Sequence, residues 1–244
     1  MQRTNICIIP SGYVRFQALQ LMSSMKGEFL AMQRRIIATV FTMIILMLLI
    51  VKQVMSHRFD VYYAVFILPY LLSNTAALIM LTLSMRNRPK EVLDSMWIFT
   101  LCLIAANLPV IVNLSGIDLS AGGEINLQVR SIAAVLSVSV APVYIYAILS
   151  LGRNLSVLPE ANELRMTRIY DYARHPLYSI YIYWYVMQVF LFQSALILVL
   201  SAVQTAFQIV RARHEEKVLL KNFPEYADYK KKVWWFGKNP FHKE

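Results

Sequence analysis

The chain has 244 residues, of which 58 % are apolar and only 16 % are charged, and its formal net charge is +10. Because soluble domains carry about a quarter charged residues, this composition excludes an ordinary soluble protein and indicates an all-α, polytopic integral membrane protein. We attribute the positive charge to membrane topology and to attraction for anionic lipid headgroups, and not to nucleic acid.

The segment 1–35 predicts an amphipathic helix that lies on the cytoplasmic leaflet. Apolar residues recur at helical spacing from Val14 to Met32, opposite polar residues such as Arg15 and Glu28. Four runs without Asp, Glu, Lys or Arg follow, and each predicts a membrane-spanning helix. They cover residues 36–51, 61–85, 95–117 and 131–151. Together they predict a four-helix transmembrane region over 36–151.

The fifth charge-free run, 176–210, is too long for one span, because a single helix of that length would extend roughly 50 Å. Its middle carries Gln193 and Ser194, so we expect a helical hairpin that turns there. This gives six spans. The region 152–244, made of a loop, this hairpin and a C-terminal segment, is the more distinctive half of the chain, and we expect the function to reside in it.

The distribution of positive charge orients these spans. Of the 24 Lys and Arg residues, 21 fall in 1–35, 86–94, 152–175 and 211–244. Since positive charge is retained in the cytoplasm, both termini and these loops are predicted cytoplasmic, in the inner membrane if the host is a prokaryote. The spans carry no ionisable side chains, which disfavours an ion pump or proton relay.

Two polar clusters flank the hairpin. Arg174 and His175 precede it, with Pro176 and Tyr178 in its first turn, and Arg211, His214, Glu215 and Glu216 follow it. Arg211 and Glu215 are four residues apart and share one helix face. On the residues alone, such clusters mark topology as readily as a site. The chain shows neither a metal-ligand cluster nor a Gly-x-Gly-x-x-Gly dinucleotide motif.

The motif Arg-His-Pro-x-Tyr, followed about 36 residues later by Arg-x-x-x-Glu-Glu, resembles the isoprenylcysteine carboxyl methyltransferase family of membrane methyltransferases. Phe223, Tyr226 and Tyr229 continue the similarity. The resemblance implies an S-adenosylmethionine site between the cytoplasmic loop and the last two helices, with a lipophilic or lipidated acceptor entering from the membrane. The residues that it assigns to the cofactor are Glu163, Leu164, Tyr170, His175, Pro176, Tyr178, Glu215 and Glu216.

The resemblance also assigns Arg211 to the acceptor, with Arg211 and Glu215 as the catalytic pair. Tyr181 and Tyr185 lie on the same helix face as Tyr178 and are candidates to line the acceptor channel. A carboxylate acceptor is ionised at neutral pH, so it needs no general base and can be oriented by a guanidinium. An amine or thiol acceptor would need a base, for which His214 or Glu216 are nearest.

Three alternatives stay open at this point. A phospholipid amine is a second class of acceptor. Sterol reductases are similar around Arg-His-Pro-x-Tyr but use a nicotinamide cofactor, and a non-catalytic membrane interaction protein is the third reading. The chain also departs from the family, whose relatives usually carry Gly-Pro where it has Arg168 and Ile169, and Gly where it has Ile180. The lost glycines predict a different loop shape and helix packing.

Overall fold

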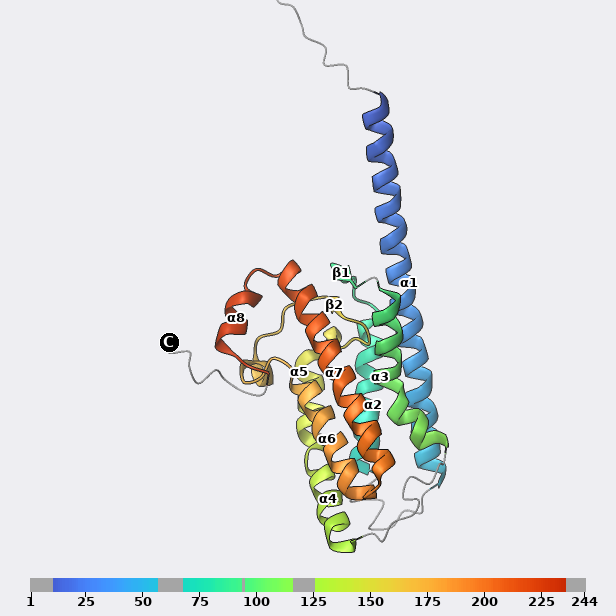
Figure 1. The fold of residues 1–244 in the computed structure, drawn as a ribbon, viewed down its shortest axis with the longest axis vertical. Helices are drawn as coiled ribbons and strands as arrows, with labels where there is room; N and C mark the ends of the chain where they lie inside the picture. The colour runs from blue at the N-terminus through green and yellow to red at the C-terminus, as the bar shows by residue number, and fades with distance from the viewer. Residues whose placement is uncertain (1–10, 57–67, 94, 116–125, 236–244) are drawn as a thin grey trace, which may run out of the picture.

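The computed structural model describes residues 11–56, 68–93, 95–115 and 126–235. This part of the chain is mostly helical, and Figure 1 shows the long helices side by side in one bundle, with α8 beside one end of it. The helices are α1 (Ser11–Ser56), α2 (Leu68–Ser84), α3 (Met96–Ser115), α4 (Leu127–Ser139), α5 (Ala141–Leu151), α6 (Pro176–Phe192), α7 (Ala195–Asn222) and α8 (Tyr226–Lys232).

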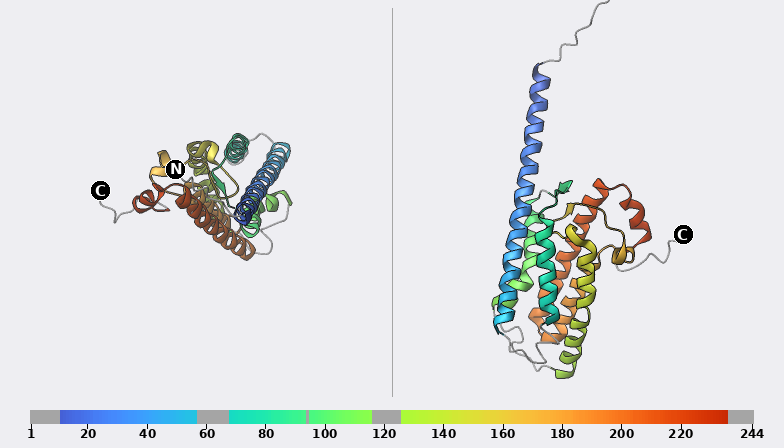
Figure 2. Two further views of the ribbon diagram at one scale, coloured as in Figure 1. Left: turned by 90° about the horizontal axis from the view of Figure 1, so that it is seen from above. Right: turned by 180° about the vertical axis from the view of Figure 1, so that it is seen from behind.

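Helix α1 is continuous over 46 residues, and its N-terminal part projects beyond the bundle (Figures 1 and 2). The sequence predicts a surface helix up to residue 35 and a separate span after it, but the structure has no break there. A change from amphipathic to apolar composition alters the surroundings that a helix prefers without interrupting its backbone hydrogen bonds. Met22, Met25 and Phe29 are exposed on the projecting part.

Three helical stretches are long and apolar enough to cross a membrane: Met25–Lys52, Leu127–Asn154 and Ala195–Asn222. Three apolar helices are shorter: Leu71–Ser84, Met96–Val112 and Pro176–Phe192. The start of the second charge-free run lies outside the described residues. The prediction of a helical protein with apolar spans is confirmed, and the count of six spans stays a prediction.

The fourth charge-free run differs in detail from its expected form. The helix begins at Leu127, because the Asn126 side chain caps it. Oδ1 of Asn126 accepts hydrogen bonds from the backbone amides of Gln128 and Val129, at 3.0 and 3.1 Å. Arg130 therefore lies inside the first turn. The run then divides into α4 and α5 at Val140, just before Pro142, whose missing N–H interrupts the hydrogen-bond ladder.

The hairpin of α6 and α7 is antiparallel and turns at Gln193 and Ser194, the polar pair where the fold-back is predicted. Gln193 adopts the left-handed conformation, with φ of 49°. Its side chain also ties the turn to the start of α4, because Oε1 accepts from the Asn126 amide and Nε2 donates to the Asn126 carbonyl, both at 3.0 Å. Tertiary contacts fix this end of the bundle.

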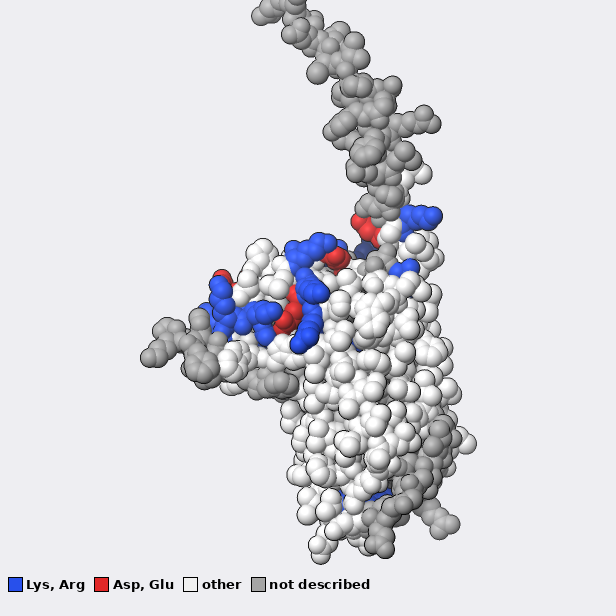
Figure 3. All heavy atoms as spheres, viewed as in Figure 1, with Lys and Arg blue, Asp and Glu red and all other residues white. Residues whose placement is uncertain are grey.

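A two-stranded ribbon lies at the opposite end. Strand β1 (Glu91–Val92) pairs antiparallel with β2 (Glu160–Ala161), with Glu91 opposite Ala161. Two residues are too few to show strand alternation, so the sequence could not predict this pair. Figure 3 shows most charged side chains in view gathered at this end, with a few basic atoms at the far end and an uncharged flank between them. The ribbon joins the loop after α2 to the loop after α5.

Candidate active site

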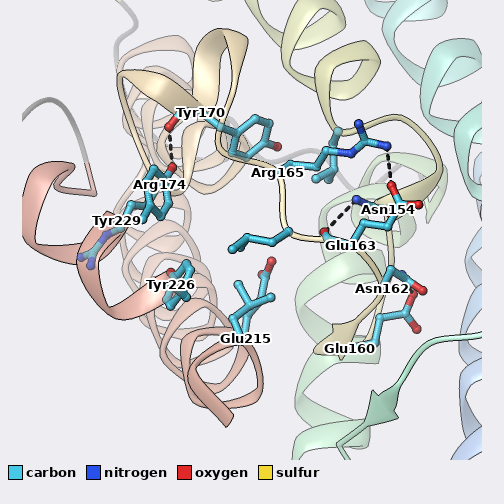
Figure 4. Close-up of a pocket in the computed structure, with 13 residues that line it drawn as sticks. Asn154, Glu160, Asn162, Glu163, Arg165, Tyr170, Arg174, Glu215, Tyr226 and Tyr229 are labelled. Atoms are coloured by element: carbon cyan, nitrogen blue, oxygen red, sulfur yellow. Dashed lines mark hydrogen bonds and ion pairs between the residues drawn. The ribbon is translucent and has the colours of Figure 1, made fainter. Parts of the chain in front are cut away.

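A pocket opens at the charged end of the bundle, between the loop after α5, the C-terminal part of α7 and helix α8 (Figure 4). Its space is about 440 Å³, a figure that includes open solvent at the mouth. Its polar lining consists of Asn154, Glu160, Asn162, Glu163, Arg165, Tyr170, Arg174, Glu215, Tyr226 and Tyr229.

Three buried polar atoms of pocket-lining residues have no hydrogen-bond partner in the described part of the chain. They are Oδ1 of Asn162, Nε of Arg174 and the hydroxyl of Tyr226. Burial raises the pKa of Tyr226, so this hydroxyl keeps its proton at neutral pH and can donate. An unpaired buried polar group is costly, and all three of these atoms belong to residues of the pocket lining.

Four of the predicted cofactor residues line this pocket: Glu163, Leu164, Tyr170 and Glu215. The loop that carries the first two is fixed by Asn154, whose Nδ2 donates to the Glu163 carbonyl at 2.9 Å. Tyr170 is buried, which raises the pKa of its hydroxyl well above the usual range, and its carbonyl accepts a hydrogen bond from the Tyr229 hydroxyl. Sequence-distant segments therefore meet here as the motif spacing predicts.

Glu215 connects the pocket to the start of α6. The Tyr178 hydroxyl donates to its Oε2 at 2.8 Å, which brings two of the predicted cofactor residues together. The Tyr178 ring in turn lies 5.4 Å from the guanidinium carbon of Arg211. Tyr178 contacts the pocket through this carboxylate and is not itself part of the lining.

The remaining predicted cofactor residues, His175, Pro176 and Glu216, lie behind the pocket wall and are buried. Pro176 occupies the first position of α6, where its missing N–H costs no helical hydrogen bond. His175 Nε2 lies 3.1 Å from Oε1 of Glu216, so the fold-back of the hairpin brings the two motifs into contact. None of the three lines the pocket.

Arg211 is 6 % exposed, yet it forms no ion pair with a carboxylate of the described residues. Its Nη1 donates to Oε1 of Gln208 and its Nη2 to the Val157 carbonyl, both at 3.0 Å. Its Nε has no hydrogen-bond partner among the described residues. A buried guanidinium held only by neutral acceptors is costly, and an anionic ligand would offset that cost.

The two predicted channel tyrosines lie farther along α6, away from the pocket. The Tyr181 hydroxyl is 3.3 Å from that of Tyr144, and the Tyr185 hydroxyl accepts from Nε2 of Gln208 at 3.0 Å. Gln208 is not among the predicted site residues, but a polar residue inside a span is expected to form interhelical hydrogen bonds, and its contacts with α3 and α6 confirm this. A signal existed, because residues 204, 208, 211 and 215 form a polar stripe on one face of an otherwise apolar helix.

A buried ion pair connects the N-terminal helix α1 to Glu160 in the pocket lining. Nε of Arg35, on α1, lies 2.6 Å from Oε2 of Glu160, and their side chains are 6 % and 1 % exposed. Arg35 also donates to the Ser84 carbonyl at 2.9 Å, and Asn162 donates to the same Glu160 carboxylate at 2.6 Å. The partners are 125 residues apart, and no local pattern in the sequence indicates that they pair.

The structure is a helical bundle with apolar spans and a polar-lined pocket at one end. Residues 133–221 match the model of the isoprenylcysteine carboxyl methyltransferase (ICMT) family, which confirms the resemblance carried by the two motifs. The predictions of a methyltransferase and of an integral membrane protein are thereby confirmed at this coarser level. No curated protein matches the chain. The matched segment contains Glu215 and the hairpin but neither Arg35 nor α8.

Proposed function

We propose that this protein transfers a methyl group from S-adenosylmethionine to the carboxylate of a lipophilic, isoprenylcysteine-like acceptor at the membrane surface. The observation that carries the proposal is the buried Arg211 guanidinium, which has no carboxylate partner among the described residues. It lies one helical turn from Glu215, which lines the pocket. An acceptor carboxylate would provide the missing negative charge beside the cofactor site.

The residues of the pocket fit this cofactor. S-adenosylmethionine carries a sulfonium and an ammonium group, and the Glu163 and Glu215 carboxylates would stabilise such positive charges. Its carboxylate could be held by Arg174, whose Nε is unpaired among the described residues. The rings of Tyr226 and Tyr229 offer apolar surface for the nucleoside. The charges and the aromatic residues of the lining therefore support the proposal.

The chemistry asks little of the protein beyond alignment and exclusion of water. When bound, S-adenosylmethionine supplies a methyl group on a positively charged sulfur. An acceptor carboxylate is ionised at neutral pH, so the new C–O bond forms while the C–S bond breaks and no proton moves. Arg211 would orient the carboxylate through its spare N–H groups. We assign Tyr178 the role of fixing the Glu215 carboxylate.

The same contacts weigh against the alternatives. Methylation of a phospholipid amine needs a base, and of the two candidates Glu216 is engaged by side chains of this chain, while His214 does not line the pocket. A nicotinamide cofactor carries several phosphate charges, which the carboxylates of Glu163 and Glu215 would repel. We therefore favour a carboxyl methyltransferase over a reductase.

Calorimetric titration of the purified protein in detergent with S-adenosylmethionine and with NADPH tests the cofactor. We expect binding of the first only, and no S-adenosylmethionine binding by folded protein would reject the proposal. The acceptor is tested by transfer of labelled methyl groups to a farnesylated cysteine and to its carboxamide, which lacks the ionised group. Arg211→Lys should remove turnover and retain cofactor binding, whereas Arg213→Lys, at an exposed neighbour, should behave as the wild type.

A further inference from the structure

Four donors converge on the carboxylate of Glu216, which is 5 % exposed. Its Oε1 lies 3.1 Å from Nε2 of His175, 3.1 Å from Nε1 of Trp235 and 3.3 Å from Nη2 of Arg174. Its Oε2 accepts from Nζ of Lys230 at 2.7 Å. Three of the four donors share Oε1 and one reaches Oε2, so both oxygens of the carboxylate are engaged by the protein.

The donors come from two separate parts of the chain. Arg174 and His175 immediately precede α6, whereas Lys230 and Trp235 belong to the C-terminal segment 226–235. Glu216, on α7, therefore joins the beginning of the hairpin to a segment that follows its end. The sequence assigned this carboxylate to the cofactor, but the structure places it behind the pocket with its contacts made by protein.

The segment 226–235 forms one wall of the pocket. Tyr226 and Tyr229 point into the pocket from it, as Figure 4 shows, and both side chains are almost fully buried. Two more hydrogen bonds hold the same segment, from the Arg174 amide to the Trp234 carbonyl at 3.0 Å and from the Tyr229 hydroxyl to the Tyr170 carbonyl. The position of this aromatic wall thus depends on contacts around Glu216.

We propose that Glu216 is a positioning residue, which fastens the C-terminal segment 226–235 to the start of α6 and so holds the wall formed by Tyr226 and Tyr229 in place. Glu216 acts on the cofactor site only through this segment. The inference rests on the proposed function in one respect, that the ligand behind this wall is S-adenosylmethionine. The fastening itself is a property of the protein without ligand.

The ionic character of the junction matters, because it is buried. The side chains of Arg174 and Glu216 are each 7 % exposed, whereas that of Lys230, which approaches the same carboxylate, is 41 % exposed. Charge-assisted hydrogen bonds in such surroundings are stronger than neutral ones. Loss of the Lys230 contact leaves the Glu216 carboxylate in place with one cation fewer. Its effect therefore distinguishes a Glu216 that binds the cofactor from a Glu216 that fastens the segment 226–235.

Hydrogen exchange of backbone amides in 226–235, measured by mass spectrometry without cofactor, reports the fastening directly, and calorimetry reports S-adenosylmethionine binding. The test variants are Lys230→Met and Trp235→Phe, which remove one donor each and retain Glu216. The matched control is Lys232→Met, at an exposed position of the same helix. We expect faster exchange and binding weakened about tenfold in both test variants, as for one lost charge-assisted hydrogen bond, and no change in the control.

If Glu216 instead bound the cofactor, removal of Lys230 would free its carboxylate and leave binding unchanged or tighter, and this result would overturn the proposal. Unchanged exchange in both test variants would overturn it as well. Glu216→Gln removes the charge and can also disturb folding, so it is compared with Glu216→Asp. The retained charge of Glu216→Asp should restore part of the binding of S-adenosylmethionine. A wild-type protein that fails to bind S-adenosylmethionine would reject the proposed function, while the exchange measurement would still decide the fastening.

Discussion

Gln208 holds Arg211 in one orientation inside the bundle. Its Oε1 accepts from Nη1 of Arg211 at 3.0 Å, while its Nε2 donates to the Ala105 carbonyl at 3.3 Å and to the Tyr185 hydroxyl at 3.0 Å. Because a backbone carbonyl only accepts and a guanidinium only donates, the Gln208 amide cannot be reversed without losing both contacts. The neutral Gln208 side chain thereby fixes the orientation of the buried Arg211 guanidinium.

We predict that Gln208→Leu lowers kcat of methyl transfer about ten- to hundredfold, the effect of losing one hydrogen bond to a charged group. The dissociation constant of S-adenosylmethionine should stay unchanged, because Gln208 does not line the pocket. Steady-state kinetics and calorimetry measure the two quantities separately. An equal loss in both would show that the substitution disturbs the whole site and would contradict a specific role in orienting Arg211.

Gln204 is 3 % exposed, and both atoms of its amide lack hydrogen-bond partners among the described residues. Since an unpaired buried polar group destabilises the folded state, Gln204→Leu should stabilise the protein by about 1 kcal/mol. The midpoint of thermal unfolding in detergent measures this. A lower midpoint would mean that a ligand, a water or a lipid group satisfies the amide in the native membrane protein.

Arg168 has a φ of 62°, in the left-handed region that favours glycine, at the position where relatives of the family usually carry glycine. The loop therefore keeps a glycine-like conformation with a less suitable residue. We expect Arg168→Gly to raise stability by up to about 1 kcal/mol, since relief of the steric cost exceeds the added freedom of the unfolded chain. Arg165→Gly, in the same loop without a positive φ, should lower the unfolding midpoint instead.

The ion pair of Arg35 and Glu160 gives a prediction about stability. Arg35→Met should destabilise the protein by about 3 kcal/mol, because it leaves a buried carboxylate without its cation. Adding Glu160→Gln should recover much of the loss, since the amide carries no charge and can still accept from Asn162. Thermal unfolding of the two single variants and the double variant tests this coupling, with Lys26→Met as a control on the exposed part of α1.

The predicted topology can be tested at two exposed positions, at opposite ends of the bundle. Gln128→Cys lies in the first turn of α4 and Lys232→Cys at the end of α8. In a Cys7→Ser background, a membrane-impermeant thiol reagent should label them from opposite sides, with position 232 in the cytoplasm. Labelling of both positions from the same side would show that the charge bias does not set the orientation of this chain.

The local patterns of the sequence predicted much of the back half. The turn at Gln193 and Ser194 follows from a charge-free run too long for one span, and the approach of His175 to Glu216 follows from motifs at the two ends of that hairpin. The roles assigned to the motif residues stay predictions. The structure adds that His175 and Glu216 lie behind the pocket, a distinction that motif spacing does not contain.

Long-range partners were beyond the reach of the sequence. Arg35 looked like one more positive charge on a surface helix, because its burial depends on β2 and the loop after α2, far along the chain. The sequence does not predict the continuity of α1 either, because the change in hydrophobicity near residue 35 resembles a boundary between two elements. The sequence indicates Tyr226 and Tyr229 only as residues that continue the similarity to the family. Their place in the pocket depends on α8 folding back toward the bundle.

The pairing of Arg35 with Glu160 also limits how such proteins can exchange parts. A chimera that joins the back half of this chain to the front half of another protein would bring together positions 35 and 160 from different sources. Where the donor of the front half lacks a cation there, a carboxylate would be sealed into the interior with nothing to neutralise it. A chimera of this chain should therefore keep positions 35 and 160 from the same source, although Arg35 lies outside the segment 133–221 that matches the family model.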